Sequence, residues 1–162
     1  MATPTTLPAA FVAGNVLEAS QLNNLRGAFR VLQVVQATNA STTTISTSTY
    51  TSINLSASIT PSATSSKILV FATVGALLKE NNTWANIKLF RGATDIFTAG
   101  SYIGYTGTAT ANGSSASLMY LDSPATVSAT TYELKLASAS NISYIQINSA
   151  ATNSIVLMEI SA

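Results

Sequence analysis

The residues of this sequence best suited to acid–base chemistry are its six carboxylic acids: Glu18, Glu80, Asp95, Asp122, Glu133 and Glu159. A glycosidase needs two carboxyl groups about 5–9 Å apart across the scissile bond, and a fold could form such a pair from Asp95 with Asp122 or Glu133. The same acids can instead cap turns, or pair with Lys88, Arg91 and Lys135 on neighbouring strands. Because each acid belongs to a different expected element, we favour capping and ion pairing over catalysis.

Other catalytic machinery is missing from the sequence. It contains no His and no Cys, and it therefore lacks the usual proton shuttle and the usual soft metal ligands. It has no G-x-S-x-G or S-x-x-K motif for an activated serine, no G-x-G-x-x-G or P-loop motif for a nucleotide, and no oxygen-rich calcium loop. We predict a protein that is not an enzyme and that has no catalytic, cofactor-binding or metal-binding residues.

Three aromatic residues lie where a ligand or a second subunit could reach them. Trp84 follows the polar run Asn81-Asn82-Thr83. Tyr102 and Tyr105 belong to GSYIGYTGTATANGS, residues 100–114, a glycine-rich stretch expected to form a long exposed loop. Aromatic rings beside polar side chains are typical of sugar-binding sites, so a host-surface glycan is one possible partner. Tyr and Trp are also enriched at subunit boundaries, and we favour that interpretation.

Short segments of alternating apolar and polar residues, separated by turn residues, cover most of the chain. Such alternation is typical of β-strands with one face on a core. The segments lie at 28–36, 50–60, 66–78, 83–90, 95–99, 115–121, 131–138, 142–148 and 154–161. Eight or nine strands at this spacing predict an all-β fold, an antiparallel β-sandwich or jelly roll. The segment at 66–78 is apolar on both faces, as expected of a central strand between two layers.

The start of the chain follows a different pattern. Pro4 and Pro8 favour an extended lead, and a leucine pattern from Glu18 predicts a short helix that ends at Gly27. Two turns of helix are marginal in water, so this segment must pack on something. We therefore divide the chain into an N-terminal attachment arm at 1–37, made of the lead, the helix and the first strand, and a β-sandwich head at 38–162. The apolar residues expected to anchor the arm are Leu7, Phe11, Val12, Val16, Leu17, Leu22 and Leu25.

Charge is scarce in this chain. Charged residues make up 8% of it and the net charge is +1, while the polar residues are mainly Ser and Thr. A monomer usually needs more surface charge to stay soluble, so much of the surface is expected to be covered by other chains. We predict a homotrimer, in which SKILVFATV at 66–74 and SIVLMEIS at 154–161 supply core and axis-facing positions. Because no basic run is present, nucleic-acid binding is not expected.

Membrane and export signals are not found in the sequence. No apolar run approaches the roughly 18 residues that span a bilayer. The first residues lack the positive region and the apolar stretch of a secretion signal. We expect that the protein is made without a signal peptide and does not insert into a membrane.

Several segments, in this order, resemble structural proteins of tailed bacteriophages, particularly those of marine and cyanobacterial phages. They are FVAGNVLEASQLNN, AFRVLQVVQ, ASITPSATSSKILVF, KLFRGATDIF, YLDSPAT with TTYELKL, and IVLMEISA, spread from residue 11 to the last residue. The resemblance implies a virion protein, made in the cytoplasm of a host bacterium, with an opening segment that attaches to the particle. It also implies a β-sandwich head that forms a homotrimer. The chain departs from true tail fibres in lacking a long shaft.

We therefore expect a fibre-like or tail-associated structural protein that binds a neighbouring phage tail or capsid protein through its arm. One alternative is a capsid decoration, or cement, protein on the exterior of the head. A second alternative is a receptor- or carbohydrate-binding tip, for which Trp84, Tyr102 and Tyr105 would supply the surface.

Overall fold

The computed structural model describes residues 31–139, 145–147 and 151–161, and its regular structure there is entirely β. The predicted antiparallel β-sandwich is confirmed. The strands are β1 (Val31–Asn39), β2 (Thr43–Ile45), β3 (Thr51–Ile59), β4 (Lys67–Lys79), β5 (Ala85–Arg91), β6 (Thr94–Ile103), β7 (Asn112–Asp122), β8 (Thr130–Ser138), β9 (Ile145–Ile147) and β10 (Asn153–Ile160). The predicted helix and the predicted anchoring residues lie outside the described residues.

The described residues form ten strands, where eight or nine were predicted for the chain. The additional strand, β2, has three residues and lies in a Ser/Thr-rich stretch whose residue types do not alternate. β9 also has three residues and falls within the predicted segment 142–148. β6 continues to Ile103 and β7 begins at Asn112, so the connection expected at 100–114 is shorter and spans 104–111.

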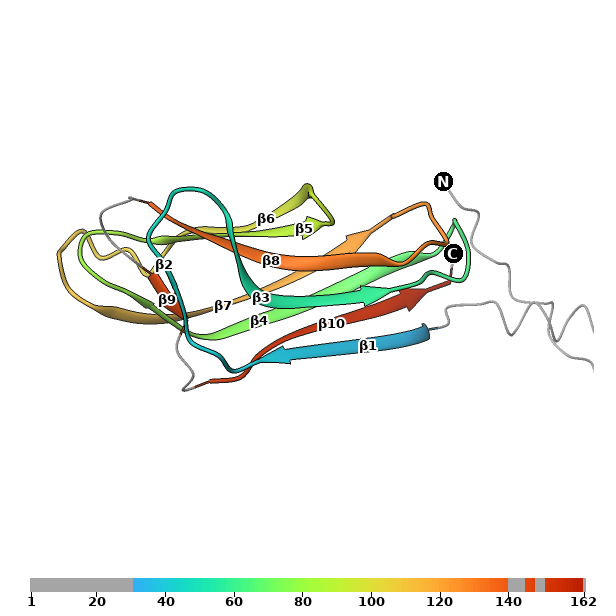
Figure 1. Ribbon diagram of the computed structural model, residues 1–162, viewed down its shortest axis with the longest axis horizontal. Helices are drawn as coiled ribbons and strands as arrows, with labels where there is room; N and C mark the ends of the chain where they lie inside the picture. The colour runs from blue at the N-terminus through green and yellow to red at the C-terminus, as the bar shows by residue number, and fades with distance from the viewer. Residues whose placement is uncertain (1–30, 140–144, 148–150, 162) are drawn as a thin grey trace, which may run out of the picture.

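The strands form two antiparallel sheets packed face to face (Figure 1). The six-stranded sheet has the order β1-β10-β4-β9-β2, with β7 on the other edge of β4. β10 and β9 pair with successive stretches of the same β4 edge, at 67–73 and 77–79. The four-stranded sheet has the order β3-β8-β5-β6. β1 was expected at the end of the arm. It is instead an edge strand of the six-stranded sheet, where it pairs with β10.

The order of pairing identifies the sandwich as a jelly roll. β1 pairs with β10, β3 with β8, β4 with β7, and β5 with β6, so the chain forms nested hairpins that close at the β5–β6 turn. These four pairs belong alternately to the two sheets, and this double-sheet arrangement is the jelly roll; the short pair β2–β9 extends the six-stranded sheet. The closing turn passes through Gly92, whose φ of +58° is a left-handed conformation that glycine adopts without strain.

The core lies between the sheets and is built by alternation along each strand. Every second side chain of β3 and β10 is buried, as the period of a β-strand requires. The buried apolar residues that the structure describes come from residues 45–157. The largest fully buried apolar side chains are Ile53, Leu55, Ile59, Ile68, Leu77, Ile87, Leu89, Leu134 and Leu136.

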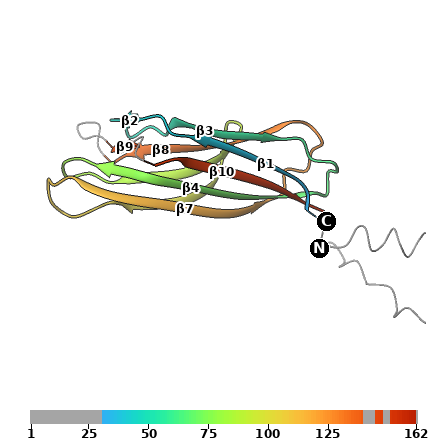
Figure 2. The ribbon, with the colours of Figure 1, turned by 90° about the horizontal axis from the view of Figure 1, so that it is seen from below.

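The two ends of the sandwich carry different segments. The start of β1 at Val31 pairs with Ile160 at the end of β10, and Ile160 pairs with Lys67 at the start of β4. β4 then runs for 13 residues, about 40 Å at the rise of an extended strand. The β4–β5 and β6–β7 connections consequently lie at the opposite end, on the left in Figures 1 and 2. We call the end with Val31 the proximal end and the other the distal end.

At the proximal end, Glu159 joins three segments of the chain. It is fully buried, and its carboxylate accepts hydrogen bonds from the Gln33 side chain at 2.6 Å and from the backbone N–H of Ser62 at 2.6 Å. Burial opposes ionisation of this carboxyl, but the hydrogen bonds from Gln33, Ser66 and Ser62 outweigh it and hold the pKa of Glu159 below its ordinary value. The carboxylate thereby ties β1 and the β3–β4 connection to β10.

We expect acid to weaken this junction. Because the folded-state pKa of Glu159 is depressed, the carboxylate contributes stability above its unfolded-state pKa, and this contribution is lost as pH falls through the folded-state value. The free energy of unfolding, measured by urea denaturation, should therefore decrease as pH falls below 4.5, the ordinary value for this carboxyl. Glu159→Gln should be less stable at neutral pH and should lose part of this decrease. Identical pH dependence in the two proteins would contradict the role of Glu159.

Candidate interaction surfaces

Each of the three acids considered for catalysis pairs with one of the three basic residues named from the sequence, although Glu133 and Lys135 lie on the same strand, β8, and not on neighbouring strands as expected. The pairs are Lys88–Asp95, Arg91–Asp122 at 2.8 Å and Lys135–Glu133 at 3.4 Å. Within the described ranges, no group of three or more acidic side chains could hold a metal ion. The geometry therefore accounts for these carboxylates as ion-pair partners.

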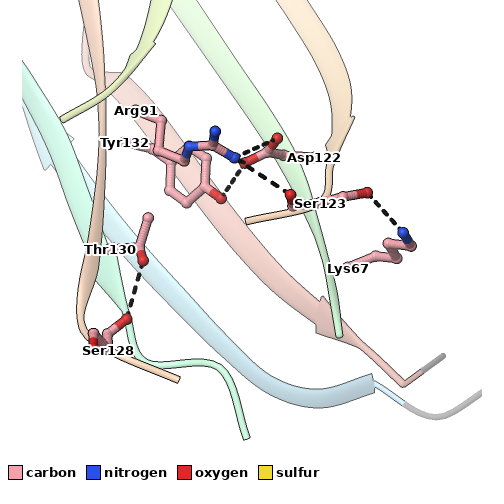
Figure 3. Close-up of polar contacts among 7 residues, drawn as sticks. All are labelled: Lys67, Arg91, Asp122, Ser123, Ser128, Thr130 and Tyr132. Atoms are coloured by element: carbon pink, nitrogen blue, oxygen red, sulfur yellow. Dashed lines mark hydrogen bonds and ion pairs between the residues drawn. The ribbon is translucent and has the colours of Figure 1, made fainter. Parts of the chain in front are cut away.

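Asp122 is the most enclosed of the three acids and forms a network between the sheets (Figure 3). The Arg91 guanidinium donates to both of its carboxylate oxygens, at 3.0 and 2.8 Å, and the buried Tyr132 hydroxyl donates to the second oxygen at 2.7 Å. Burial, followed by the hydrogen bond to Asp122, raises the pKa of Tyr132 far above its ordinary value. Lys67 donates to the neighbouring Ser123 hydroxyl at 2.7 Å. The network fixes β5, β7 and β8 relative to one another.

The three aromatic residues identified in the sequence come together at the distal end. The rings of Trp84 and Tyr102 are stacked, with centroids 4.6 Å apart. The Tyr105 ring meets both edge-on, 5.2 Å from Trp84 and 6.0 Å from Tyr102. Tyr102 is 61% exposed and Tyr105 is 50% exposed, while Trp84 is half-buried. We call these three side chains the aromatic tip.

A buried lysine, which the sequence analysis did not identify, supports the segment that carries Tyr105. Lys79 has no exposed surface, and its ammonium donates hydrogen bonds to the Asn81 carbonyl at 3.0 Å, the Thr106 hydroxyl at 2.5 Å and the Thr108 carbonyl at 2.9 Å. These bonds replace the hydration that burial removes. Lys79 thus joins the β4–β5 and β6–β7 connections. A lysine that ends an apolar strand is normally solvent-exposed, so no local pattern indicated this role.

A second surface is the outer face of the six-stranded sheet, whose strands lie side by side in Figure 2. Pairing aligns apolar side chains in rows across β1, β10, β4 and β7. Among them, Met119 is 64% exposed and Val34 is 56% exposed. We define the apolar face as nine side chains: Val31, Val34, Leu69, Phe71, Met119, Leu121, Val156, Met158 and Ile160.

The expectation that β4 is covered on both faces is not met within one chain. Ile68 and Val70 point into the core, whereas Phe71 is 38% exposed on the opposite face. Met119 and Leu121 were also not assigned to a surface from the sequence. Their period-two spacing in SASLMYL places them on one face, but only the pairing of β7 with β4 brings them beside Phe71 and Leu69.

The outer face of the four-stranded sheet is polar by comparison. Ser58 and Thr131 share a hydrogen bond between their hydroxyls at 2.7 Å. Lys88 lies over the ring of Tyr50, 4.8 Å from its centroid, and pairs with Asp95. The two outer faces of the sandwich therefore differ sharply in polarity.

A shallow hollow of about 470 Å³ adjoins a bulge in β4 between Val74 and Leu77. Its lining comes from 75–78 and 113–115, which are small or aliphatic residues without charge. This composition offers no acid, base or metal ligand for chemistry.

The described part of the chain contains no helix with the length and hydrophobicity needed to cross a bilayer. No family model matches the chain, and no curated protein matches it. Among solved structures, it is similar to VP2 in the crystal structure of the infectious bursal disease virus VP2 subviral particle, with 11% sequence identity and a TM-score of 0.35. The match covers 79% of this chain and 39% of that chain, so this chain spans about two fifths of the length of the protein that it matches.

Proposed function

We propose that this chain is a non-enzymatic structural protein of a tailed-phage virion, a homotrimeric fibre-like or tail-associated component attached by its N-terminal arm. The observation that carries the proposal is the apolar face, a continuous surface across four strands. Large exposed apolar patches on soluble proteins mark contact surfaces for other proteins. The segments that resemble tailed-phage structural proteins supply the virion context.

The apolar face has a size suited to the centre of a subunit interface. Three rows of positions about 7 Å apart, on four strands about 4.8 Å apart, cover on the order of 400 Å². Nine of these twelve positions are apolar, and the rows also contain Gln36 and Lys67, so the apolar part covers on the order of 300 Å². One partner in a standard interface buries about 800 Å², including a polar rim. The next row along the strands is polar and suits that rim; it consists of Thr38, Ser154, Thr73 and Ser117.

A three-fold arrangement is favoured by the scarcity of charge. Only 8% of the residues are charged, so few charged side chains are available to keep the outer faces of both sheets hydrated in a monomer. Packing three copies around an axis covers both the apolar face and part of its Ser/Thr-rich surroundings. β4 and β10, which contain the segments predicted to face the axis, lie at the centre of the apolar face.

Attachment is assigned to the part of the predicted arm that precedes β1, because β1 itself pairs with β10 in the sandwich and begins at the proximal end. Each anchoring side chain buried in a groove of a neighbouring virion protein contributes about 1.5–3 kcal/mol before ordering costs. Three arms on one trimer add avidity. The proposed anchoring residues are Phe11, Val12, Val16, Leu17, Leu22 and Leu25, with Leu7.

The alternative location is the capsid exterior, where a decoration protein would use the same arm on the shell. Both locations give a virion protein with the same subunit interface. An electron-microscopy map of the intact particle separates them, because it shows directly whether the trimers lie on the tail or on the head.

Deleting residues 1–27 tests the proposed arm. The buried apolar residues that the structure describes lie at 45–157, so the truncated protein should fold, remain oligomeric and show a thermal midpoint only a few degrees from that of the full chain. It should no longer join particles in an assembly assay with phage lacking this protein.

Leu22→Asp with Leu25→Asp in the full chain is the matched test without truncation. It should also abolish incorporation, because two carboxylates in an apolar groove cost several kcal/mol. Normal incorporation of the truncated protein would place attachment elsewhere. Unfolding on truncation would assign the segment to the core of the head.

A further inference from the structure

We infer that the aromatic tip is a binding site for a neutral carbohydrate, with the exposed ring of Tyr102 as its stacking platform. This inference does not depend on the virion role, because the site belongs to a single chain. It rests on the exposure and geometry of the three rings, on the rigid support of their segments, and on the chemistry of the residues around them.

The rings form a surface and not a small core. A core cluster would bury its rings, whereas Tyr102 and Tyr105 keep 61% and 50% of their surface exposed. Tyr102 uses one ring face to stack on Trp84 at 4.6 Å. A ring stacked on one side and exposed to this degree has its other face available. A flat aromatic face is suited to the C–H face of a pyranose ring.

The platform is preorganised at a conformational cost. Tyr102 has a φ of +59°, a left-handed conformation that a bulky residue rarely adopts and that is often retained at ligand-binding sites. The backbone N–H of Tyr105 donates to the Tyr102 carbonyl at 3.2 Å and closes the turn between the two rings. On the C-terminal side, Lys79 holds Thr106. A surface held in this way loses little entropy when it binds a ligand.

The surrounding residues favour a neutral ligand with many hydroxyl groups. The segment after Tyr105 presents a chain of hydroxyls, with Thr106 and Thr108 3.2 Å apart and Thr108 and Thr110 2.9 Å apart. All three threonines are exposed, but the Thr106 hydroxyl already accepts from the Lys79 ammonium, so Thr108 and Thr110 supply the hydroxyls for a ligand. Hydroxyls can both donate to and accept from sugar hydroxyls.

Charged ligands fit less well. The Lys79 ammonium is buried and already donates to three oxygens, so it offers no group for an anion. A cage for a quaternary ammonium needs aromatic faces turned toward a common centre, but Trp84 and Tyr102 are stacked on each other.

The position of the tip separates it from the proposed subunit interface. Along β4, Phe71 in the apolar face and Lys79 below the β4–β5 connection are eight residues apart, about 25 Å in an extended strand. The tip also lies at the distal end, away from Val31 and the proximal end where β1 begins. Subunit contact through the apolar face therefore leaves the tip accessible.

Trp84 is the only tryptophan in the chain, so its fluorescence reports directly on the site. The full-length protein is titrated with an array of neutral oligosaccharides of hexoses, with free N-acetylneuraminic acid as the anionic probe and choline as the cationic probe. We expect saturable fluorescence changes with neutral oligosaccharides, with dissociation constants of about 1 mM or tighter, and none with the two charged probes. Tyr102→Ala and Tyr105→Ala should each weaken binding at least about tenfold.

Two matched variants show whether the loss of oligosaccharide binding comes from the stacking ring of the aromatic tip. Tyr102→Phe keeps the stacking ring and should retain affinity within about threefold. Tyr50→Ala removes a half-buried tyrosine from the outer face of the four-stranded sheet and should leave binding unchanged. If Tyr102→Ala fails to fold by circular dichroism, Tyr105→Ala carries the test.

Three outcomes would overturn the inference. The first is the absence of saturable binding to every neutral oligosaccharide in the array. The second is binding that survives both alanine substitutions. The third is a lower oligomeric mass for Tyr102→Ala or Tyr105→Ala than for Tyr50→Ala, which would make the tip a subunit contact.

Discussion

Replacing Phe71 and Met119 with Asp is expected to convert the oligomer into folded monomers. The two side chains are paired across β4 and β7 at the centre of the apolar face, and burying two carboxylates there would cost several kcal/mol per subunit. Both positions are exposed in the single chain, at 38% and 64%, so the fold itself should tolerate the change. Light scattering at micromolar concentration should give the mass of three 16.7 kDa chains for the wild type and of one chain for the variant.

The matched control carries the same two charges on the other outer face. Ser58→Asp with Thr131→Asp alters an exposed pair on the four-stranded sheet and should leave the trimer intact. A monomeric wild type, or a Phe71→Asp/Met119→Asp protein that stays trimeric, would refute the proposed interface. If the wild type is a dimer and the same substitutions dissociate it, the proposed interface is supported and the three-fold arrangement is refuted.

Asp122→Ala is expected to destabilise the fold strongly. It leaves the buried Tyr132 hydroxyl without its acceptor and the Arg91 guanidinium without its counterion. Removing one partner from such a network should lower the free energy of unfolding by about 2–4 kcal/mol. Urea denaturation at neutral pH measures the loss.

Two further substitutions show whether the loss of stability in Asp122→Ala comes from the broken network or only from the removal of a charge. Asp95→Ala breaks the more exposed pair with Lys88 and should cost less than about 1 kcal/mol. Tyr132→Phe removes one hydroxyl and keeps the buried ring, so it should cost about 1 kcal/mol. An Asp122→Ala protein as stable as Asp95→Ala would show that the Asp122 network contributes little.

Local pattern determined the strands and several of their contacts. The alternation in YTSINLSASIT appears as the buried residues Ile53, Leu55 and Ile59, because a β-strand turns every second side chain toward the same face. The pairs Lys88–Asp95 and Lys135–Glu133 were predictable for a similar reason. Their members lie close together in sequence, in one hairpin and on one strand, so local geometry nearly suffices to bring them together.

Only the tertiary structure decided the surfaces. Trp84 and Tyr102 lie 18 positions apart, and their stacking depends on how the β4–β5 and β6–β7 connections meet at the distal end. Likewise, Lys79 is buried because Thr106 and Thr108 close over its ammonium. Hydrogen bonds between residues so far apart follow from the fold and leave no local signal.

The apolar face shows the same limit most clearly. The sequence by itself determined that β4 is apolar on both faces, but not which residues would join it on its outer side. That depends on register, since shifting a strand by one residue turns its whole side-chain set to the opposite face. The pairing Leu69–Leu121 and Phe71–Met119 therefore created a contact surface that alternation alone could not locate. Burial of the opposite faces in the shared core selects that register, and the core forms only when distant strands pack together.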